Sequence, residues 1–304
     1  MAVLDGTVIK FAEFVDEATM GTTPTNPTMK SFFGQFISGT ISSAPNIDKF
    51  NVMKSASSTD PLSSGKAWKV GESHKITIKV KPTSIGWMPY ALHAASTTTY
   101  AAGKVPHYIS IGMVIGDKFC VAKGCVMESA SCDFNDMKKS AELTLEFICA
   151  DVTDWSSIDY IGLGAHAAEV TTTPYNLVED VTYVLYDGVA LSSSDLIFES
   201  LKFGAGAKVE AVQDLSSSLE SKIAAYALSE RSLPLEVKIT AMSATVQNDL
   251  RDADTHTFAF TLGGKKITIS SVVWSNSPAF ELDPVKRVGM SLSADAQSAR
   301  IAIA

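Results

Sequence analysis

The segment Lys118–Val152 constrains the fold of this chain most strongly, because it has the pattern of a β-hairpin. Its second arm, ELTLEFIC from Glu142 to Cys149, alternates apolar residues with mainly polar ones. Successive side chains of a strand point to opposite faces, so this arm is expected to be buried on one face and wet on the other. Asn135-Asp136 and the lysines that follow supply the turn between the arms.

The hairpin pattern returns later in the chain. Val126-Met-Glu128-Ser129 is matched by Ile197-Phe-Glu199-Ser200, 71 residues further on. The frame of the second arm, KSxxLxLxF from Lys139, is matched by RSxxLxVxI from Arg231, 92 residues further on. The second copy therefore contains an insertion of about 21 residues between its arms. These matches predict a duplicated sheet unit.

The composition favours a sheet-rich globular protein and argues against nucleic-acid binding. The chain has 304 residues, of which 46% are hydrophobic and only 19% are charged, and Ser and Thr are abundant. The formal net charge is −8 and no run of five basic residues occurs, whereas phosphate binding requires clustered Lys or Arg. No segment has the length and apolarity of a membrane helix, so no membrane association is expected.

Strands are expected along most of the chain, with one helix. Residues 1–60 are expected to be mainly irregular, and SASSTDPLSSG (55–65) is either a surface loop or an arm that orders against a neighbouring subunit. Apolar residues recur at helical spacing in Leu215–Leu228, inside the insertion, which is therefore predicted to be a helix. Strands are expected at 69–81, 107–115, 181–186, 196–202, 235–241, 285–293 and 300–303, with one or two helical turns at 85–95 and a hairpin at 255–274.

A boundary between two domains is predicted near Trp155–Ala168, where the strict alternation stops. The first domain comprises residues 1–165, with an N-terminal arm and loop. The second comprises residues 166–304 and contains the inserted helix near 214–228.

No recognised catalytic or cofactor motif occurs, so no enzyme, cofactor or metal site is expected. The sequence has no GxSxG, no P-loop and no GxGxxG between a strand and a helix, and Gly204-Ala-Gly206 is interpreted as a turn. The four cysteines are not spaced as CxxC and are interpreted as small packing residues, and the five histidines are scattered. Glu128 and Glu199 occupy matching repeat positions, and we interpret them as solvent-side or subunit salt-bridge residues rather than an acid–base pair.

Three pieces of the chain resemble the tail tube proteins of long-tailed phages and related viruses. EATMGTTPTNP, from Glu17 to Pro27, resembles the N-terminal stretch E-x-T-x-G-T-x-P of that family. GCVMES from Gly124, followed by ELTLEF from Glu142, resembles the family's hairpin. Asp283–Ala304 resembles its final strand pair. The resemblance spans most of the chain, and the order of the pieces carries it.

The resemblance implies a mainly β fold of two tandem tail-tube-like β-sandwich or barrel units with short flanking helices. Subunits of that family form rings that stack into a hollow tube for genome passage, and two-unit members form trimeric rings with pseudo-six-fold symmetry. The implied location is the virion tail, assembled in the host cytoplasm. The implied partners are copies of the chain in trimeric pseudo-hexameric or hexameric rings, the tape measure, terminator and baseplate or tip proteins, and DNA that passes without specific binding.

The tail tube hypothesis assigns roles to two sets of residues. The hairpins at 118–150 and 196–241 form the inner barrel, whose acidic balance keeps a passing polyanion from binding. The candidate residues of the polar, lumen-facing surface are Glu128, Glu142, Glu146, Glu199 and Glu236. The candidate residues of an inter-ring arm are Thr19, Gly21, Pro24 and Pro27.

Three alternatives stay open at the level of sequence. A tube of a contractile injection or secretion system has the same fold and a different payload. A two-domain β-sandwich carbohydrate-binding or adhesin module requires exposed tryptophans, whereas the tryptophans of this chain are interpreted first as core or interface anchors. An enzyme of an unrecognised family is the third alternative.

Overall fold

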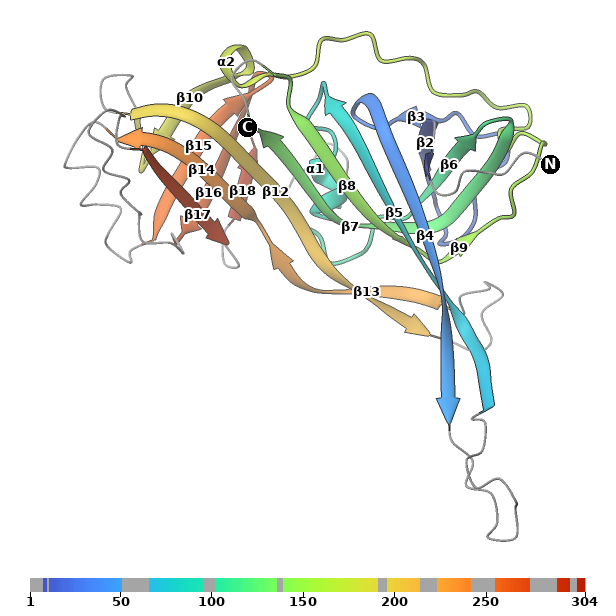
Figure 1. The fold of residues 1–304 in the computed structure, drawn as a ribbon. Helices are drawn as coiled ribbons and strands as arrows, with labels where there is room; N and C mark the ends of the chain where they lie inside the picture. The colour runs from blue at the N-terminus through green and yellow to red at the C-terminus, as the bar shows by residue number, and fades with distance from the viewer. Residues whose placement is uncertain are drawn as a thin grey trace, which may run out of the picture.

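The part of the chain that the structure describes folds into two antiparallel β-sheets with two short helices (Figure 1). The computed structural model describes residues 8–9, 11–50, 66–95, 102–135, 139–190, 196–213, 223–241, 255–273, 289–295 and 300–303. The mainly β class predicted from the sequence is confirmed. Within these ranges, no helix is long and apolar enough to cross a membrane.

Thirteen of the described strands form the larger sheet. They are β1 (Val8–Ile9), β2 (Phe11–Asp16), β3 (Lys30–Ser31), β4 (Gly34–Phe50), β5 (Lys66–Pro82), β6 (Ile109–Ile115), β7 (Lys118–Phe134), β8 (Glu142–Cys149), β9 (Asp151–Val152), β12 (Leu196–Gln213), β13 (Ile223–Ser232), β14 (Pro234–Ala241) and β17 (Gly289–Asp295). The smaller sheet consists of β10 (Val181–Tyr186), β11 (Val189–Ala190), β15 (His256–Leu262), β16 (Lys265–Val272) and β18 (Arg300–Ile303).

The main path of the larger sheet runs β1-β4-β5-β8-β7-β12-β14-β17. Every neighbouring pair along this path is antiparallel. Among the described strands, nothing pairs with the outer edge of β17, and β1 covers only Gly39 and Thr40 of β4. As far as the described strands show, the sheet is therefore open at both ends.

The two predicted hairpins are present, and they pair in the same register. In β7–β8, Met127 lies opposite Phe147, and the register shifts between Met127 and Ser129. In β12–β14, Phe198 lies opposite Ile239, and the register shifts between Phe198 and Ser200. Adding 71 to the residue number on β7 and 92 to the residue number on β8 turns every pair from Val126 to Cys132 into a pair of β12 and β14. The two bulges fall on Glu128 and Glu199. A bulge is a local structural feature that a duplicated hairpin would retain, so the hairpins are structurally equivalent.

The two hairpins join along β7 and β12. Cys132 lies opposite Phe203, its own counterpart in the repeat, so the local two-fold axis of the sheet passes through this pair. Gly204-Ala-Gly206, predicted to be a turn, instead lies within β12. A Cβ atom at Gly204 would lie 2.4 Å from the carbonyl oxygen of Ala130 on β7, so glycine permits the close approach of the two strands.

The predicted helix in the insertion is wrong over its described part. Residues 214–222 lie outside the described ranges, and Ile223–Ser232 is strand β13, which pairs antiparallel with β12. The insertion therefore lengthens the second hairpin. The apolar spacing of this segment also suits a strand that is packed on one face. Ile223 and Tyr226 lie on either side of a register shift, and both are buried in one cluster with Val126 and Ala150. Tertiary packing overrides the helical periodicity here.

The expectation of a mainly irregular N-terminal region is also wrong. β4 and β5 pair along their whole length, from Gly34 opposite Pro82 to Phe50 opposite Lys66. In contrast, β5 pairs with β8 only from His74 to Val80. The distal part of the β4–β5 hairpin therefore continues as a two-stranded ribbon away from the body of the fold (Figure 1). β4 escaped prediction because two register shifts interrupt its alternation. The segment 55–65, predicted to be a loop or arm, lies outside the described residues.

One continuous core joins both halves of the chain. The dry face of the main path packs on the smaller sheet and on β2 and β6, which lie off this path in the larger sheet, and α1 (Met88–Ala91) is buried among them. The predicted helical turns at 85–95 are thus confirmed. Phe203 of β12 contacts Trp87, Phe134 and Phe260, with ring centroids 5.8, 6.4 and 5.0 Å apart, respectively. Side chains on both sides of the predicted domain boundary therefore share this core.

The four cysteines are all buried, as their interpretation as packing residues requires. Cys125 and Cys149 also form a disulfide between β7 and β8, which the spacing in the sequence did not predict. Cys120 and Cys132 are free thiols, and burial raises the pKa of both, that of Cys120 to about 11. These two thiols are therefore protonated and unreactive.

We predict that the two halves unfold together. Phe203→Ala removes a fully buried ring from the shared core and is expected to lower the free energy of unfolding by about 3–5 kcal/mol. Urea unfolding followed by circular dichroism and by tryptophan fluorescence should give one shifted transition. Val212→Ala, at an exposed position of the same strand, serves as the control with little expected effect. Two separated transitions in the wild type would contradict a shared core.

Candidate functional site

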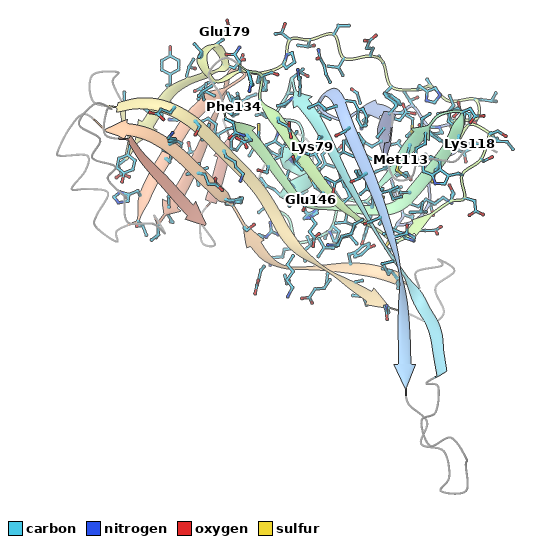
Figure 2. All side chains as sticks on the ribbon, viewed as in Figure 1. Lys79, Met113, Lys118, Phe134, Glu146 and Glu179 are labelled. Atoms are coloured by element: carbon cyan, nitrogen blue, oxygen red, sulfur yellow. A yellow bond between two sulfur atoms is a disulfide. The ribbon has the colours of Figure 1, made fainter. Side chains whose placement is uncertain are left out.

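The wet face of the larger sheet is a continuous polar surface. On β5, Lys75, Lys79 and Lys81 are exposed while Ile76, Ile78 and Val80 are buried, as the alternation predicts. The same alternation continues on β8, β7, β12 and β14. Figure 2 shows Lys79 and Glu146 on the neighbouring strands β5 and β8. All five candidate acids lie on these strands: Glu128, Glu142, Glu146, Glu199 and Glu236.

Lysines pair with most of the acids on this face. The ion pairs and their N–O distances are Lys75–Glu128 (3.2 Å), Lys79–Glu142 (2.8 Å), Lys202–Glu236 (3.0 Å), Lys238–Glu199 (3.0 Å) and Lys208–Glu210 (3.1 Å). Glu146 instead accepts a hydrogen bond from the Ser129 hydroxyl at 2.8 Å. Exposed pairs of this kind each contribute only about 0–1 kcal/mol to stability. Their main consequence is a face that alternates in sign, rather than the acidic face expected from the net charge.

The two bulge residues occupy equivalent positions on this face. Glu128 and Glu199 are half-buried, and each reaches a lysine of its own half of the sheet, Lys75 or Lys238. Both are therefore satisfied by partners within the chain. This arrangement agrees with their interpretation as solvent-side strand residues, and an acid–base pair would require the two carboxylates to share one site.

The segment predicted to form an inter-ring arm begins around one buried carboxylate. Oε1 of Glu17 accepts hydrogen bonds from the Ser110 hydroxyl (2.5 Å) and the Gly124 N–H (2.9 Å), and Oε2 accepts one from the Gly21 N–H (2.7 Å). Gly21 has φ +75°, which suits glycine. The glutamate and glycine of the E-x-T-x-G motif thus fix a turn onto β6 and β7.

The remaining arm residues differ in their surroundings. Thr19 is exposed, Pro24 is half-buried, and Pro27 is buried, with its carbonyl accepting from the Ala165 N–H at 3.0 Å. The stretch is therefore held against its own chain, and only part of it is open to a neighbour. Its inter-ring role stays a prediction.

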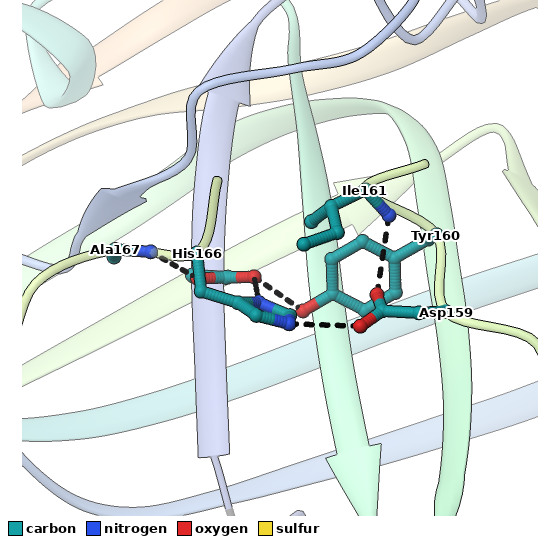
Figure 3. A network of polar contacts seen from close by, with 6 residues as sticks. Asp159, Tyr160, Ile161, His166 and Ala167 are labelled. Carbon is teal, nitrogen blue, oxygen red and sulfur yellow. Dashed lines mark hydrogen bonds and ion pairs between the residues drawn. The ribbon is translucent and has the colours of Figure 1, made fainter. Parts of the chain in front are cut away.

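A second buried carboxylate anchors the long connection between the two halves. Glu13 of β2 is fully buried, and Tyr160, His166 and the N–H of Ala167 converge on it (Figure 3). The Tyr160 hydroxyl donates to Oε1 at 2.6 Å, and the Ala167 N–H donates to Oε2 at 2.7 Å. Burial, with the adjacent Glu13 carboxylate, raises the pKa of Tyr160, so its hydroxyl remains a donor. We call this set the Glu13 clamp.

The clamp depends on a glycine and on a histidine. A Cβ atom at Gly112, opposite Glu13 on β6, would lie 2.3 Å from Cζ of Tyr160, so the ring rests directly on the strand backbone. Nδ1 of His166 lies 2.6 Å from Glu13, and Nε2 lies 2.9 Å from Asp159. Partial burial lowers the pKa of His166, but the hydrogen bonds and charges of the two carboxylates outweigh it and raise the pKa overall. When protonated, the ring donates to both carboxylates.

Sequence reasoning missed the Glu13 clamp. Its members are separated by about 150 positions in the chain and form no motif, so only the fold brings them together. One signal for this buried site was available in the sequence: Glu13 is the lone acid in the apolar strand FAEFV. A carboxylate buried in such a strand requires hydrogen-bond partners.

The described residues offer no candidate metal site. No group of three His, Cys, Asp or Glu side chains among them could hold a metal ion. Of the tryptophan side chains that the structure describes, Trp87 is buried and Trp155 is half-buried, so neither forms an exposed sugar-binding platform. No protein-family model matches the sequence. A comparison with curated proteins finds no significant match.

We predict that the Glu13 clamp is strongest at low pH. The raised pKa of His166 contributes stability that is fully present below the ordinary histidine value of about 6.5 and is lost as the pH rises through the folded-state value. The difference in unfolding free energy between wild type and His166→Gln should therefore be largest near pH 5 and should shrink towards pH 9. Urea titrations across this range measure it. A difference that grows with pH would contradict the assignment.

Proposed function

We propose that the chain is a structural subunit of a hollow tube, of the kind formed by tail tube proteins, and that it conducts a genome without binding it. One observation carries the proposal: an amphipathic sheet with one wet face and two open edges. Open edges invite pairing with another chain, and closure of the sheet removes them. In a closed ring the wet face is free to line a lumen.

The direction of the strands supports closure through copies of the same chain. The main path contains eight strands that alternate in direction, so β1 and β17 run in opposite directions. In a ring of chains related by rotation about the tube axis, β17 of one chain then meets the β1–β4 edge of the next with antiparallel polarity. The sheet continues across the junction without a change of pairing type.

The strand order also bears on the symmetry of the ring. A pseudo-six-fold ring requires the second hairpin to repeat the order of the first around the tube. The order β8-β7-β12-β14 instead relates the two hairpins by a two-fold axis normal to the sheet. We therefore propose a ring whose repeating unit is the whole chain. The projecting β4–β5 ribbon serves as the contact to an adjacent ring, since an isolated two-stranded ribbon is only marginally stable alone.

As proposed, the chain is a non-enzymatic protein of the virion tail, with copies of itself and other tail proteins as partners. A contractile injection or secretion tube would share the sheet and the lumen and differ in its payload. The alternating charge of the wet face favours a non-adhesive lining, because neither sign forms a patch that binds a passing polyanion or polycation.

Negative-stain electron microscopy of the purified chain at increasing concentration tests the assembly. We expect rings or hollow tubes, and rotational averaging then gives the number of chains per ring. Uniform small particles at every concentration, including in the presence of preformed rings as seeds, would argue against a tube subunit.

We predict that reversing acids on the wet face makes the lumen adhesive. In Glu142→Lys/Glu146→Lys, four positive charge units are added where lysines already lie nearby, so assembled tubes should retain short DNA at low salt and release it at high salt. Co-sedimentation of labelled DNA with tubes measures the effect. Glu169→Lys/Glu179→Lys changes the net charge equally at exposed positions outside this face. Equal DNA retention by both variants would remove the argument for a lumenal wet face.

A further inference from the structure

The second hairpin carries an extension that reaches onto the first half of the chain. β12 pairs with β7 as far as Gly206, and from Ala207 to Gln213 its only partner among the described strands is β13. We call residues 207–213 together with β13 the β13 extension. In Figure 1 the extension lies below β7, on the side of the first half.

A small apolar cluster holds the tip of the β13 extension. Ile223 and Tyr226 are buried there with Val126 of β7 and with Ala150, which follows β8. The Tyr226 hydroxyl is buried and has no hydrogen-bond partner among the described residues, which weakens the contact. The cluster alone therefore attaches the extension only lightly.

Arg231 holds the base of the extension through two backbone carbonyls. One guanidinium nitrogen donates to the carbonyl of Leu92 at 3.2 Å, and another donates to the carbonyl of Gly103. Both carbonyls belong to the loop that follows α1, and α1 packs on β7 and β12. Hydrogen bonds from a charged donor are stronger than neutral ones, so Arg231 is the principal polar contact at this point.

His93 lies between the two carbonyls that Arg231 contacts. Its side chain is 1% exposed, and a Cβ atom at Gly103 would lie 1.7 Å from the His93 carbonyl oxygen, so the loop closes tightly over this residue. The backbone of His93 has φ +48°, a conformation that His and Asn adopt more often than most residues. The His107 N–H donates to Nδ1 of His93 at 3.4 Å, so this nitrogen carries no proton in the neutral ring.

The surroundings of His93 disfavour a positive charge. The two charges that act on it, those of His107 and Arg231, are both positive. Burial, together with these charges, lowers the pKa of His93 from the ordinary 6.5 to about 4, and a backbone hydrogen bond with Met127 of β7 does not outweigh them. The histidine is therefore neutral near pH 7.

The remaining titratable group of α1 does not offset this effect. The hydroxyl of Tyr90 donates to Asp16 of β2 at 2.9 Å, and Lys30 forms an ion pair with the same carboxylate. Burial, with the Asp16 charge, raises the pKa of Tyr90, so the phenol stays neutral. A proton on His93 would thus meet two cations and gain no anionic partner from α1.

We propose that His93 and Arg231 form an acid-sensitive latch for the β13 extension. While His93 is neutral, Arg231 holds the base of the extension on the loop after α1. A proton on Nδ1 of His93 breaks the hydrogen bond from the His107 N–H and places a new cation beside the guanidinium, so Arg231 leaves the carbonyls for water. The extension then opens while the rest of the sheet stays folded. The latch acts within one chain and does not depend on the proposed tube.

The direction of the pH effect follows from proton linkage. Because the pKa of His93 is lowered in the closed form, that form binds fewer protons than the open one. The stability of the closed form is complete above pH 6.5 and is lost as the pH falls towards about 4. Between pH 7 and pH 5 the equilibrium constant for opening should rise about tenfold or more. Ordinary carboxylates, with pKa values of about 4, stay mostly ionised in this range.

Amide hydrogen exchange on the full chain tests the latch. The protection of Ile223–Ser232, corrected for the intrinsic exchange rate at each pH, should fall about tenfold or more from pH 7 to pH 5. Residues 74–80 of β5 lie in the core and serve as the internal reference, whose protection should not change. Loss of protection in both segments would show global unfolding and would overturn the latch.

Three variants separate the latch from other pH effects. His93→Asn suits the positive φ and cannot be charged, so its extension should be equally protected at pH 5 and pH 7. Arg231→Gln removes the tie, so its extension should exchange rapidly even at pH 7. His166→Gln is the matched control and should keep the wild-type response, because the contribution of His166 to stability is already complete below pH 6.5. An unchanged response in His93→Asn would overturn the latch.

A titration of the five histidines by nuclear magnetic resonance gives a readout that does not require His93→Asn to fold. With ¹⁵N-labelled histidine, one imidazole of the wild type should titrate with a midpoint well below pH 6.5. That midpoint should rise in Arg231→Gln, because one of the two cations facing His93 is removed. Five midpoints near or above 6.5 would overturn the proposal, as would a low midpoint that Arg231→Gln leaves unchanged.

Discussion

The antiparallel pairing of β7 with β12 is the interaction on which the rest of the structure depends. Each hairpin alone would be a small two- or three-stranded unit, and joining them produces a sheet wide enough to bury one core. Gly204 permits the required approach to Ala130, and Phe203, opposite Cys132, carries aromatic contacts into both halves. Each copy of the hairpin is therefore stabilised by the other copy. The backbone hydrogen bonds between β7 and β12 and the core packing that both copies share provide this stabilisation.

This junction explains the amphipathic character of the whole molecule. Because side chains alternate strictly across a sheet, fixing one face in the core commits every second residue of the neighbouring strands to water. The chain fills those positions with lysines and acids that pair in alternation, so the face stays hydrated without a strong field of either sign. The apolar burial that stabilises the fold lies on the dry face, and the wet face stays exposed to solvent.

Two buried glutamates fix the segments that the sheet itself does not hold. Glu17 binds the N-terminal turn to β6 and β7, and Glu13 binds the connection between the halves to β2. Burial of a carboxylate is costly unless its oxygens are well partnered, and each of these accepts at least two hydrogen bonds from the segment or strands that it joins. Both segments are thereby given defined positions against the sheet.

The sequence by itself determined the β class, the repeated hairpin with its offsets and the sidedness of strands such as Glu142–Cys149, because alternation is a local property that records burial directly. It failed for β4 and β13, where bulges break the alternation and distant partners select a strand over a helix. The alternation also assigned the five candidate acids to strands, where they lie, but it gave no lysine partners for them. Only the tertiary structure decided that Glu13, Tyr160 and His166 meet, and that the second hairpin is turned about a two-fold axis. Contacts between residues far apart in the chain leave no periodic signal, so they become visible only once the strands have been ordered.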